Sequence, residues 1–310
     1  MAEQRPDWRG VFPAVTTQFR EDFSVDFEAT ARVITALVGD GVSGLVIGGT
    51  VGENTALSTS EKVALLEVAR DAAQGQVPVI AGVAEYTAAF GAAYAREAER
   101  VGVDGLMVMP AMVYAAKPRE TVEHFRTIAS ASDLPIMIYN NPPAYRTDVT
   151  PAMLKQLADM DTIVAFKESS GDTRRFVDIR NLLGDRYIPF CGLDDVVLES
   201  ITLGAVGWVS GLSNVFPREG ETLFRLVASG RLTEAMPLYD WFMPLLHFDA
   251  RPDLVQAIKL CERIMGRGGE RTRPPRLPLD PAEVAEIEAI LGRALSRRPD
   301  LPDVGLPEAA

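Results

Sequence analysis

The sequence predicts a parallel α/β fold, an eight-fold (β/α) TIM barrel with a helical extension at its C-terminal end. Two observations carry this prediction. Apolar runs rich in β-branched residues recur eight times and alternate with segments of helical periodicity. No glycine fingerprint for nucleotide binding follows the first run, which favours a closed barrel over an open, doubly wound sheet. We expect the barrel within residues 1–230, the helical extension within 231–296 and a loosely attached or partner-contacting tail over 297–310.

The expected strands are short and mostly apolar, as strands covered on both faces should be. In chain order they cover residues 11–17, 44–48, 77–81, 105–109, 135–139, 163–167, 187–191 and 205–209. In a closed barrel the functional site lies at the C-terminal ends of the strands, so the residues at these ends are the first candidates for chemistry.

Polar residues mark the starts of several intervening helices. Ser58 followed by Glu61 has the spacing of a capping box, in which side-chain and backbone groups satisfy one another. Thr150 before Pro151 is an N-cap followed by the proline that a first helical turn tolerates, and Lys117 precedes a proline in the same way. Beyond the eighth unit we expect helices within residues 232–246, 252–265 and 281–295, and a proline-rich loop over 267–279.

Composition and charge disfavour several classes of protein. The net charge of −12 argues against nucleic acid or anionic membranes as partners, since both favour basic surfaces. No run approaches the roughly 18 apolar residues of a membrane span, and residues 1–10 lack the apolar core of a signal peptide, so we expect a cytoplasmic protein. Cys191 and Cys261 should be buried free thiols. With only His124 and His247, neither near the end of an expected strand, we expect no metal site.

The sixth expected strand ends on a lysine. In TIVAFKESS, residues 162–170, apolar residues lead up to Lys167. If Lys167 points into the barrel, the two-residue period of a strand turns Ile163 and Ala165 inward with it. Val164 and Phe166 then face the covering helices. This orientation places one primary amine among apolar neighbours.

A buried amine can act as a nucleophile. Desolvation disfavours the ammonium form, so Lys167 could lose its proton near neutral pH and attack a carbonyl to form a Schiff base. The alternative is a lysine that extends to the barrel rim or pairs with Glu168. The strand by itself leaves both interpretations open.

Two other strand ends carry groups that could serve such chemistry. The second strand ends in GGTVGEN, residues 48–54, a glycine-rich turn whose backbone N–H groups and Thr50 hydroxyl can hold a carboxylate. The fifth ends in IMIYNNPP, residues 136–143, in which Tyr139 faces inward with Met137 and could transfer protons near Lys167. The alternatives are a tight turn without a ligand and a core tyrosine bonded to the backbone.

Together these segments resemble the motifs of a known enzyme family. GTVGE at residues 49–53, YNNP at 139–142 and FKESSGD at 166–172 look like those of the dihydrodipicolinate synthase and N-acetylneuraminate lyase family. The likeness extends over residues 11–266. It implies an eight-fold barrel with a C-terminal helical extension, usually a tetramer built from dimers. It also implies a Schiff base between a lysine and a 2-keto acid, with no cofactor.

The resemblance assigns roles by position. Lys167 resembles the Schiff-base lysine and Tyr139 the proton-transferring tyrosine. Thr50 matches the first threonine of the family's G-T-T-G-E, which a hydroxyl relay links to that tyrosine. The backbone N–H groups of Thr50 and Val51 would hold the carboxylate of the keto acid.

Two further positions would line the pocket. In GWVSGLSN, residues 207–214, Val209 would do so through its backbone. Gly192 lies where the seventh strand opens onto the pocket, although a capped turn over residues 192–194 explains this segment at least as well.

Three departures from the family pattern bear on the substrate. Val51 replaces the second threonine and removes a hydroxyl. Ala144 stands where the synthase has an arginine for the carboxylate of its aldehyde partner, and Arg146 is in another register. The loop PAMVYAAKP, residues 110–118, lacks the synthase's paired tyrosines, and Tyr114 does not align with a relay tyrosine. These departures disfavour lysine biosynthesis.

The predicted function is that of a Schiff-base lyase or deaminase for a 2-keto acid or cyclic imine carboxylate, in a homotetramer. GENTALS, YNNPPAY and TRPPRLPL resemble the catabolic branch of the family, and specifically Δ1-pyrroline-4-hydroxy-2-carboxylate deaminase of hydroxyproline degradation. The alternatives are 4-hydroxy-tetrahydrodipicolinate synthase, a pyruvate aldolase, a keto-deoxy sugar acid dehydratase and a non-catalytic barrel that binds keto acids. A metal-dependent aldolase is disfavoured by the shortage of histidines.

Overall fold

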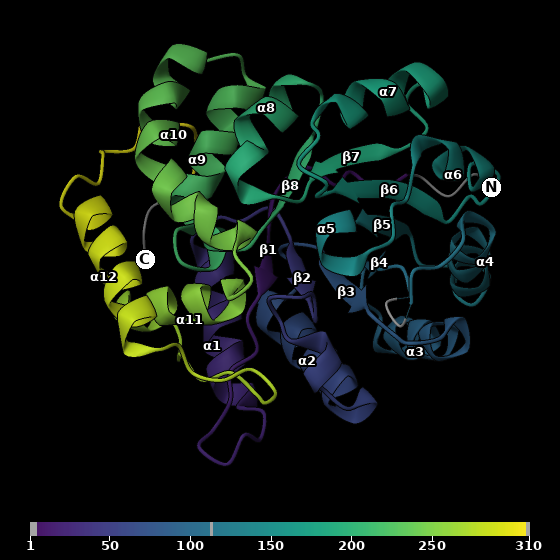
Figure 1. Cartoon of the computed structure of the whole chain (residues 1–310), viewed down its shortest axis with the longest axis horizontal. Helices are drawn as coiled ribbons and strands as arrows, with labels where there is room; N and C mark the ends of the chain where they lie inside the picture. The colour runs from purple at the N-terminus through teal and green to yellow at the C-terminus, as the bar shows by residue number, and fades with distance from the viewer. Residues whose placement is uncertain (1–4, 112–113, 308–310) are drawn as a thin grey trace.

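The computed structural model describes residues 5–111 and 114–307 and shows a closed barrel of eight parallel strands. The strands pair in chain order and β8 returns to pair with β1 (Figure 1). Their bounds are β1 Gly10–Val15, β2 Leu45–Ile47, β3 Val79–Val83, β4 Gly105–Val108, β5 Ile136–Asn140, β6 Ile163–Glu168, β7 Ile188–Cys191 and β8 Gly207–Ser210. This pairing confirms the predicted barrel and excludes the open, doubly wound sheet.

The predicted strand ends agree with the structure to within two residues. The third strand shows why they differ, since it is predicted over residues 77–81 and β3 is Val79–Val83. The N–H of Leu45 donates to the Pro78 carbonyl at 2.9 Å, and Leu45 and Val79 form the first residue pair between β2 and β3. Because proline has no N–H to donate, the ladder starts after Pro78.

Helices alternate with the strands and continue beyond β8. They are α1 Phe27–Gly39, α2 Thr59–Ala73, α3 Ala88–Val101, α4 Pro118–Ala129, α5 Pro142–Tyr145, α6 Pro151–Gln156, α7 Arg174–Leu183, α8 Val197–Thr202, α9 Pro217–Ala228, α10 Leu232–Leu246, α11 Leu254–Ile264 and α12 Pro281–Leu295. Short 3-10 turns are η1 Asn54–Ala56, η2 Asp194–Val196, η3 Leu212–Asn214 and η4 His247–Ala250.

The predicted helix starts are confirmed. The Ser58 hydroxyl accepts from the Glu61 N–H at 3.3 Å, and the Glu61 carboxylate accepts from the Ser58 N–H at 2.8 Å, which completes the capping box of α2. Thr150 caps α6 with its hydroxyl. The N–H of Lys117 is satisfied at the start of α4 by the side chain of Glu120, at 2.8 Å.

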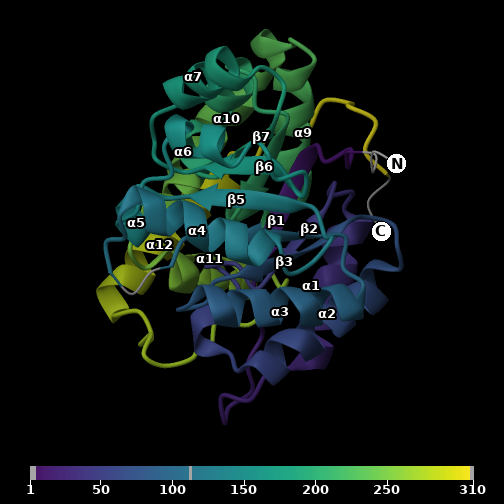
Figure 2. The same ribbon diagram turned by 90° about the vertical axis from the view of Figure 1, so that its right-hand side faces the viewer.

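Three helices follow the eighth β/α unit. Figures 1 and 2 show α10, α11 and α12 on the side of the barrel away from α3 and α4. Helix α10 packs against α9 and α12, and α11 packs against α12. Residues 267–280 contain no helix or strand, as predicted for the proline-rich loop. The division of the chain into barrel and extension stays a prediction.

The tail up to residue 307 is tied to α9 and the start of α10 rather than free of the barrel. The Arg218 guanidinium donates to the Pro307 carbonyl at 2.8 Å, and Arg225 donates to the Gly305 carbonyl at 3.0 Å. Arg231 donates to the carbonyl of Asp303 at 3.1 Å. For the described part of the tail, these contacts correct the expectation of a loose attachment, while contact with a partner stays a prediction.

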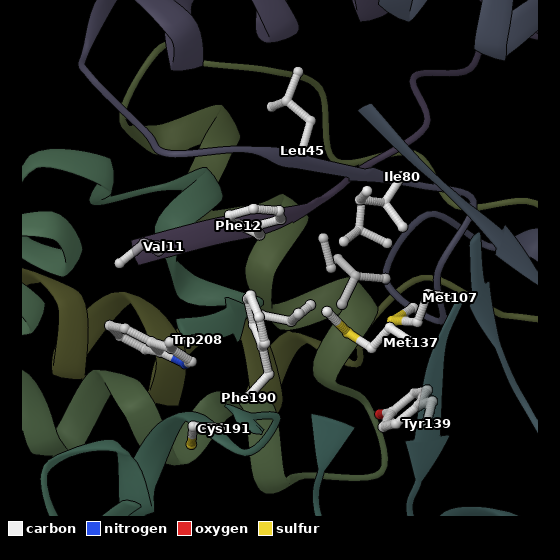
Figure 3. Packing of buried hydrophobic residues seen from close by; sticks show 14 of the residues in the cluster. Val11, Phe12, Leu45, Ile80, Met107, Met137, Tyr139, Phe190, Cys191 and Trp208 are labelled. Carbon is white, nitrogen blue, oxygen red and sulfur yellow. The ribbon is translucent and has the colours of Figure 1, made fainter. Parts of the chain in front are cut away.

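The barrel interior is filled by side chains from alternating strand positions. Figure 3 shows Phe12, Phe190, Met107 and Met137 in the space that the strands enclose, with Tyr139 beside Met137. The rings of Phe12 and Phe190 pack edge to face with their centroids 5.3 Å apart. Large side chains of this kind leave room for a ligand only toward the barrel ends.

Strand β6 shows the predicted orientation of its side chains. The Phe166 ring lies 5.8 Å from the ring of Phe176 in α7, outside the barrel, while Lys167 lines a pocket within it. Cys191 and Cys261 are buried free thiols, as predicted. In the described part of the chain, no helix has the length and apolar character needed to cross a membrane.

Candidate active site

A narrow pocket of about 50 Å³ opens where the strands end. It contains all six residues nominated from the sequence, namely Thr50, Val51, Tyr139, Lys167, Gly192 and Val209. The rest of its lining comes from Ala14, Gly49, Met107, Asn141, Ala144, Leu193, Gly211, Asp249 and Leu254. A larger hollow of about 690 Å³ lies outside the barrel between α7 and α9 and contains none of the nominated residues.

Lys167 and Tyr139 lie side by side on neighbouring strands. They are partners in the register of β5 and β6, and the Lys167 Nζ lies 3.7 Å from the centroid of the Tyr139 ring. Both are buried, with exposed fractions of 5% and 4%. Gly192 makes room for the lysine, because a Cβ at this position would lie 2.5 Å from Lys167 Cε. The predicted inward orientation is therefore confirmed.

Lys167 does not pair with Glu168. The Glu168 carboxylate instead accepts from Asn140 Nδ2 at 3.0 Å and from the Ser170 N–H at 2.7 Å. Burial raises the pKa of Glu168, and these donors oppose the shift. Within residues 5–111 and 114–307, the Lys167 amine has no hydrogen-bond acceptor on the protein, only the face of the Tyr139 ring.

A second tyrosine stands between Thr50 and Tyr139. The Thr50 hydroxyl is hydrogen-bonded to the hydroxyl of Tyr145. The ring of Tyr145 packs edge to face against Tyr139, with centroids 5.4 Å apart. The Tyr139 hydroxyl itself accepts from Asn141 Nδ2 at 3.1 Å. The expected link from Thr50 to Tyr139 is thus not direct, since the neighbour of Thr50 is Tyr145.

The Tyr145 phenol is held in its neutral form. Burial raises its pKa well above the ordinary value, the nearby Tyr139 phenol raises it further, and the bond to Thr50 opposes the shift. A neutral phenol can donate one proton and accept another in the same step. With its hydroxyl bonded to Thr50 and the Tyr139 phenol close by, Tyr145 therefore has the chemistry of a proton relay between these two hydroxyl groups.

Sequence reasoning missed Tyr145 because its position depends on a single helical turn. Asn141 caps α5 by accepting from the Ala144 N–H at 3.1 Å, and Pro142 starts the turn. The turn brings Tyr145 back over the strand end that carries Tyr139. An Asn-Pro pair is a recognisable helix start, so the signal was present in YNNPPAY.

The glycine-rich turn after β2 has the form of an anion cradle. Asn54 fixes it by donating from Nδ2 to the carbonyls of Gly48 at 2.8 Å and Gly82 at 2.9 Å. Thr50 and Val51 lie at its tip and line the pocket. In the part of the chain that the structure describes, their backbone N–H groups have no protein acceptor. Such groups are available to a carboxylate.

A buried ion pair between Glu53 and Lys259 holds this turn in place. Glu53 adopts a left-handed conformation with φ of 57°, and its carboxylate accepts from the Lys259 amine of α11 at 3.1 Å. The same amine donates to the Thr17 carbonyl at 2.7 Å and to the carbonyl of Arg271. The second Glu53 oxygen accepts from the Arg273 N–H at 3.0 Å. The loop over 267–280 and α11 are thereby joined to the cradle.

Asp249 enters the pocket from η4, an element that sequence reasoning did not connect with the site. Its Oδ2 accepts from the Asp194 N–H at 3.3 Å. Burial raises the pKa of Asp249 to about 6, and the positive charge of Lys167 opposes the shift. No local pattern indicated this residue, because its place depends on how the chain returns over the barrel after α10.

Asp194 itself has a structural place. It is fully buried, and its carboxylate accepts from Trp208 Nε1 and from the Leu212 N–H, each at 2.8 Å. The alternative of a capped turn over residues 192–194 is wrong in its detail, because η2 has no side-chain cap and Asp194 instead joins this turn to β8 and η3. Gly192, in contrast, lines the pocket.

The departures from the family pattern lie in different parts of the structure. Ala144 lines the pocket at the position where the synthase has its arginine, and Arg146 is exposed outside the lining. Tyr114 is 58% exposed and borders a separate surface hollow with Tyr86. Across residues 5–111 and 114–307, no three His, Cys, Asp or Glu side chains gather in a way that could hold a metal ion.

The arrangement has the components of carbonyl chemistry. A buried amine without a protein acceptor can attack a carbonyl carbon, phenols and a hydroxyl can move protons, and free backbone N–H groups can orient a carboxylate. Burial of Lys167 and Tyr139 strengthens these polar interactions relative to those in bulk water.

Comparison with known sequences gives one consistent family. The model of the dihydrodipicolinate synthetase family matches residues 7–294. A DapA-like lyase of Rhizobium meliloti is 33% identical over 292 residues, which cover 93% of this chain and 97% of that protein. A 4-hydroxy-tetrahydrodipicolinate synthase of Desulforamulus reducens is 33% identical over 288 residues, covering 92% of this chain and 95% of that protein.

Solved structures share the fold. Dihydrodipicolinate synthase from Aquifex aeolicus superposes with a TM-score of 0.89 at 28% identity, covering 92% of this chain and 98% of that one. YagE, a prophage protein of the dihydrodipicolinic acid synthase family from E. coli K12 in complex with pyruvate, gives a TM-score of 0.88 at 26% identity. Its alignment covers 94% of this chain and 99% of that one.

Proposed function

This chain belongs to the dihydrodipicolinate synthetase family, and we propose that it is a Schiff-base lyase for a 2-keto acid or cyclic imine carboxylate that works without a cofactor. One observation carries the proposal. The Lys167 amine is buried 3.7 Å from the Tyr139 ring centroid, in a pocket that also holds the glycine-rich turn. A positioned amine, a proton carrier and a carboxylate cradle are what imine formation with a keto acid requires.

In this proposal the residues have distinct roles. The N–H groups of Thr50 and Val51 orient the substrate carboxylate, and Lys167 attacks the adjacent C=O or C=N carbon. Tyr139 transfers protons at the reacting carbon and nitrogen, and Thr50 and Tyr145 return protons to it. Gly192 and Val209 shape the wall beside the imine. The protonated imine then draws electrons from the neighbouring carbon, which eases bond cleavage there.

The specific substrate that we propose is Δ1-pyrroline-4-hydroxy-2-carboxylate. Lys167 adds to the ring C=N carbon, and the ring C–N bond then breaks, which leaves the lysine imine and a primary amine at C5. Loss of a C3 proton and the C4 hydroxyl releases water. The resulting double bond moves to form an imine at C5, which one water hydrolyses to release ammonia, and a second water frees Lys167. The products are 2-oxoglutarate semialdehyde and ammonia, with one water consumed overall.

The composition of the pocket supports a substrate with a single carboxylate. Ala144 replaces the arginine that would pair with a second carboxylate, and no arginine lines the described pocket. The pyrroline carries one carboxylate, and the cradle can hold it. The same argument fits a keto-deoxy sugar acid dehydratase or a pyruvate aldolase, which the product assay below separates.

The synthase activity is the second candidate, because the relative from Desulforamulus reducens is named a 4-hydroxy-tetrahydrodipicolinate synthase. That reaction joins pyruvate to an aldehyde that carries its own carboxylate. If Ala144 cannot replace the arginine, condensation should be slow. Measuring condensation of pyruvate with aspartate semialdehyde beside ammonia release from the pyrroline decides between the two.

Reductive trapping tests the shared first step. Incubation with pyruvate and borohydride should add the mass of the reduced adduct to Lys167, located by peptide mass spectrometry. Pyruvate is the first probe because YagE, from the same family, was solved in complex with it. Absence of an adduct with pyruvate and with the pyrroline would reject the Schiff-base function. An adduct without any released product would instead identify a keto-acid-binding barrel, and activity that excess chelator abolishes would point to a metal-dependent aldolase.

We also propose that the chain forms a homotetramer in the cytoplasm. Large aromatic side chains on the surface near α3 support self-association, with Tyr86 58% and Phe90 60% exposed. Light scattering coupled to size-exclusion chromatography tests the assembly, and cell fractionation tests the location. The net charge of −12 continues to argue against nucleic acid and anionic membranes as partners.

A further inference from the structure

Asp249 has a position that the proposed mechanism does not use. It lines the same pocket as Lys167 and Tyr139, although it comes from η4, beyond the eighth β/α unit. The backbone leaves room for its carboxylate at Gly211, where a Cβ would lie 2.5 Å from Asp249 Oδ1. Because Gly211 and Asp249 both line the pocket, the carboxylate lies at the pocket wall.

The hydrogen bonding of Asp249 is incomplete. Among the described residues, its one donor is the Asp194 N–H, at 3.3 Å to Oδ2. A carboxylate can accept about four hydrogen bonds, so capacity remains on both oxygens. The side chain is partly exposed, which is consistent with access from the mouth of the pocket.

Charge in the pocket is unevenly distributed. Among the described lining residues the ionisable side chains are Lys167, Tyr139 and Asp249, and none is an arginine. The Lys167 charge acts on Asp249, and the Asp249 charge in turn raises the pKa of Tyr145. Asp249 is thus the one carboxylate among the described lining residues.

We propose that Asp249 selects the substrate by its distal end, accepting a hydrogen bond from a hydroxyl or ammonium group and repelling a second carboxylate. This inference rests on the proposed function, because it takes the proximal end to be bonded to Lys167. In the proposed deamination, the ring-opened intermediate carries a C4 hydroxyl and a C5 amine. Both groups are donors of the kind that Asp249 can accept.

The test compares three keto acids that differ at the distal end. Pyruvate has no distal group, 4-hydroxy-2-oxobutanoate has a hydroxyl, and 2-oxoglutarate has a carboxylate. For each, the half-saturating concentration for the borohydride-trapped adduct is measured at pH 8, where Asp249, with its pKa of about 6, is ionised. In the wild type, the half-saturating concentration of 2-oxoglutarate should be about ten-fold higher than that of 4-hydroxy-2-oxobutanoate.

Asp249→Asn should reduce the ratio of the half-saturating concentration of 2-oxoglutarate to that of the hydroxy acid by about ten-fold, since it removes the repulsion and weakens the acceptor. The half-saturating concentration of pyruvate should change by no more than about three-fold, because pyruvate does not reach the distal region. Asp253→Asn is the matched control, since it removes a carboxylate from the neighbouring segment that is paired to Arg251 at 2.8 Å and does not line the pocket. Its ratio should stay at the wild-type value.

The outcomes separate the two proposals. Adduct formation with an unchanged ratio in Asp249→Asn would overturn the selectivity role and leave the Schiff-base function intact. No adduct with any of the three acids in the wild type would reject the Schiff-base function itself. Asp249→Ser, measured in the same way, must shift the ratio in the same direction, and a melting curve for each variant shows that the folded protein is being compared.

Discussion

Lys167 and Lys259 are both buried amines beside an aromatic ring, yet their surroundings suit them to different tasks. Lys167 is 5% exposed, with its Nζ 3.7 Å from the Tyr139 ring centroid, and Lys259 is 0% exposed, with its Nζ 4.7 Å from that of Phe19. Lys259 donates to the Thr17 and Arg271 carbonyls and to Glu53. Lys167 has no such acceptor among the described residues.

The comparison shows that burial alone does not identify a nucleophile. Burial lowers the pKa of Lys259, although the Glu53 charge opposes the shift. A lowered pKa by itself would therefore identify Lys259, and not Lys167, as the nucleophile. Its three hydrogens are committed to acceptors, so its nitrogen cannot reach a substrate, and Lys259 does not line the pocket. What distinguishes Lys167 is an amine with free hydrogen-bonding capacity that faces a cavity.

The largest expected effect comes from replacing Lys167. Lys167→Met should lower turnover by about 10⁴-fold or more, as for other covalent nucleophiles, and should abolish the trapped adduct. Its melting temperature should change little, because the amine makes no hydrogen bond to any described residue that the variant would lose. Lys259→Met is the matched control and should still form the adduct at Lys167. An adduct that persists in Lys167→Met would reverse the assignment of the two lysines.

The second prediction concerns the stability that Lys259 provides. Lys259→Met leaves the fully buried Glu53 carboxylate without its main partner and should cost about 3–5 kcal/mol of unfolding free energy. Urea unfolding of this variant and of Lys167→Met measures the difference directly. In Lys259→Met with Glu53→Gln, the losses should be less than additive. Equal stability of the two single variants would contradict the structural role of Lys259.

The third prediction tests whether the Tyr145 hydroxyl helps Lys167 to react. Tyr145→Phe removes the hydroxyl that is bonded to Thr50 and should slow turnover by about 10²-fold. Tyr187→Phe is the control, since its hydroxyl donates to the Leu154 carbonyl at 2.7 Å, outside the pocket. In Tyr145→Phe the adduct should form more slowly while its final yield stays the same. An unchanged rate of imine formation would exclude Tyr145 from the relay.

The sequence was sufficient for the fold and for the residues on the strands. Lys167 and Tyr139 end successive strands, and the two-residue period already turns both inward, so closure of the barrel brings them together. The observed strand ends differ from the predicted ones where a local feature decides where strand pairing begins, as Pro78 does before β3. Strand pattern and barrel closure together thus determine most of the geometry.

The residues that were missed depend on contacts that no local pattern encodes. Tyr145 reaches Thr50 only through the one-turn helix α5, and Asp249 reaches the pocket only because the chain after α10 returns over the barrel. The partner of Lys259, Glu53, lies far away in the sequence, beside the cradle. Such pairs follow from how α10 and α11 pack, which periodicity does not specify.

The smallest expected effect tests the charge balance near Lys259. Glu262 is fully buried, and one of its oxygens accepts from the Thr16 hydroxyl at 2.9 Å, while the other has no partner within residues 5–111 and 114–307. Burial raises its pKa to about 7. Between pH 4.5 and about 7, the folded protein keeps a proton here that the unfolded chain has released. The contribution of Glu262 to unfolding free energy therefore falls as pH rises through this window.

Glu262→Gln removes that titration. The variant should gain stability relative to the wild type between pH 5 and pH 8, by roughly 3 kcal/mol at most. Urea unfolding at several pH values measures the difference, in which titrations common to both proteins cancel. Glu288→Gln, at a side chain that is 49% exposed, should give a flat difference over the same range. If the unfolding free energies of Glu262→Gln and the wild type ran parallel across this pH range, the Lys259 charge would be keeping Glu262 ionised. The charges around Lys259 would then be paired with one another, unlike the amine of Lys167.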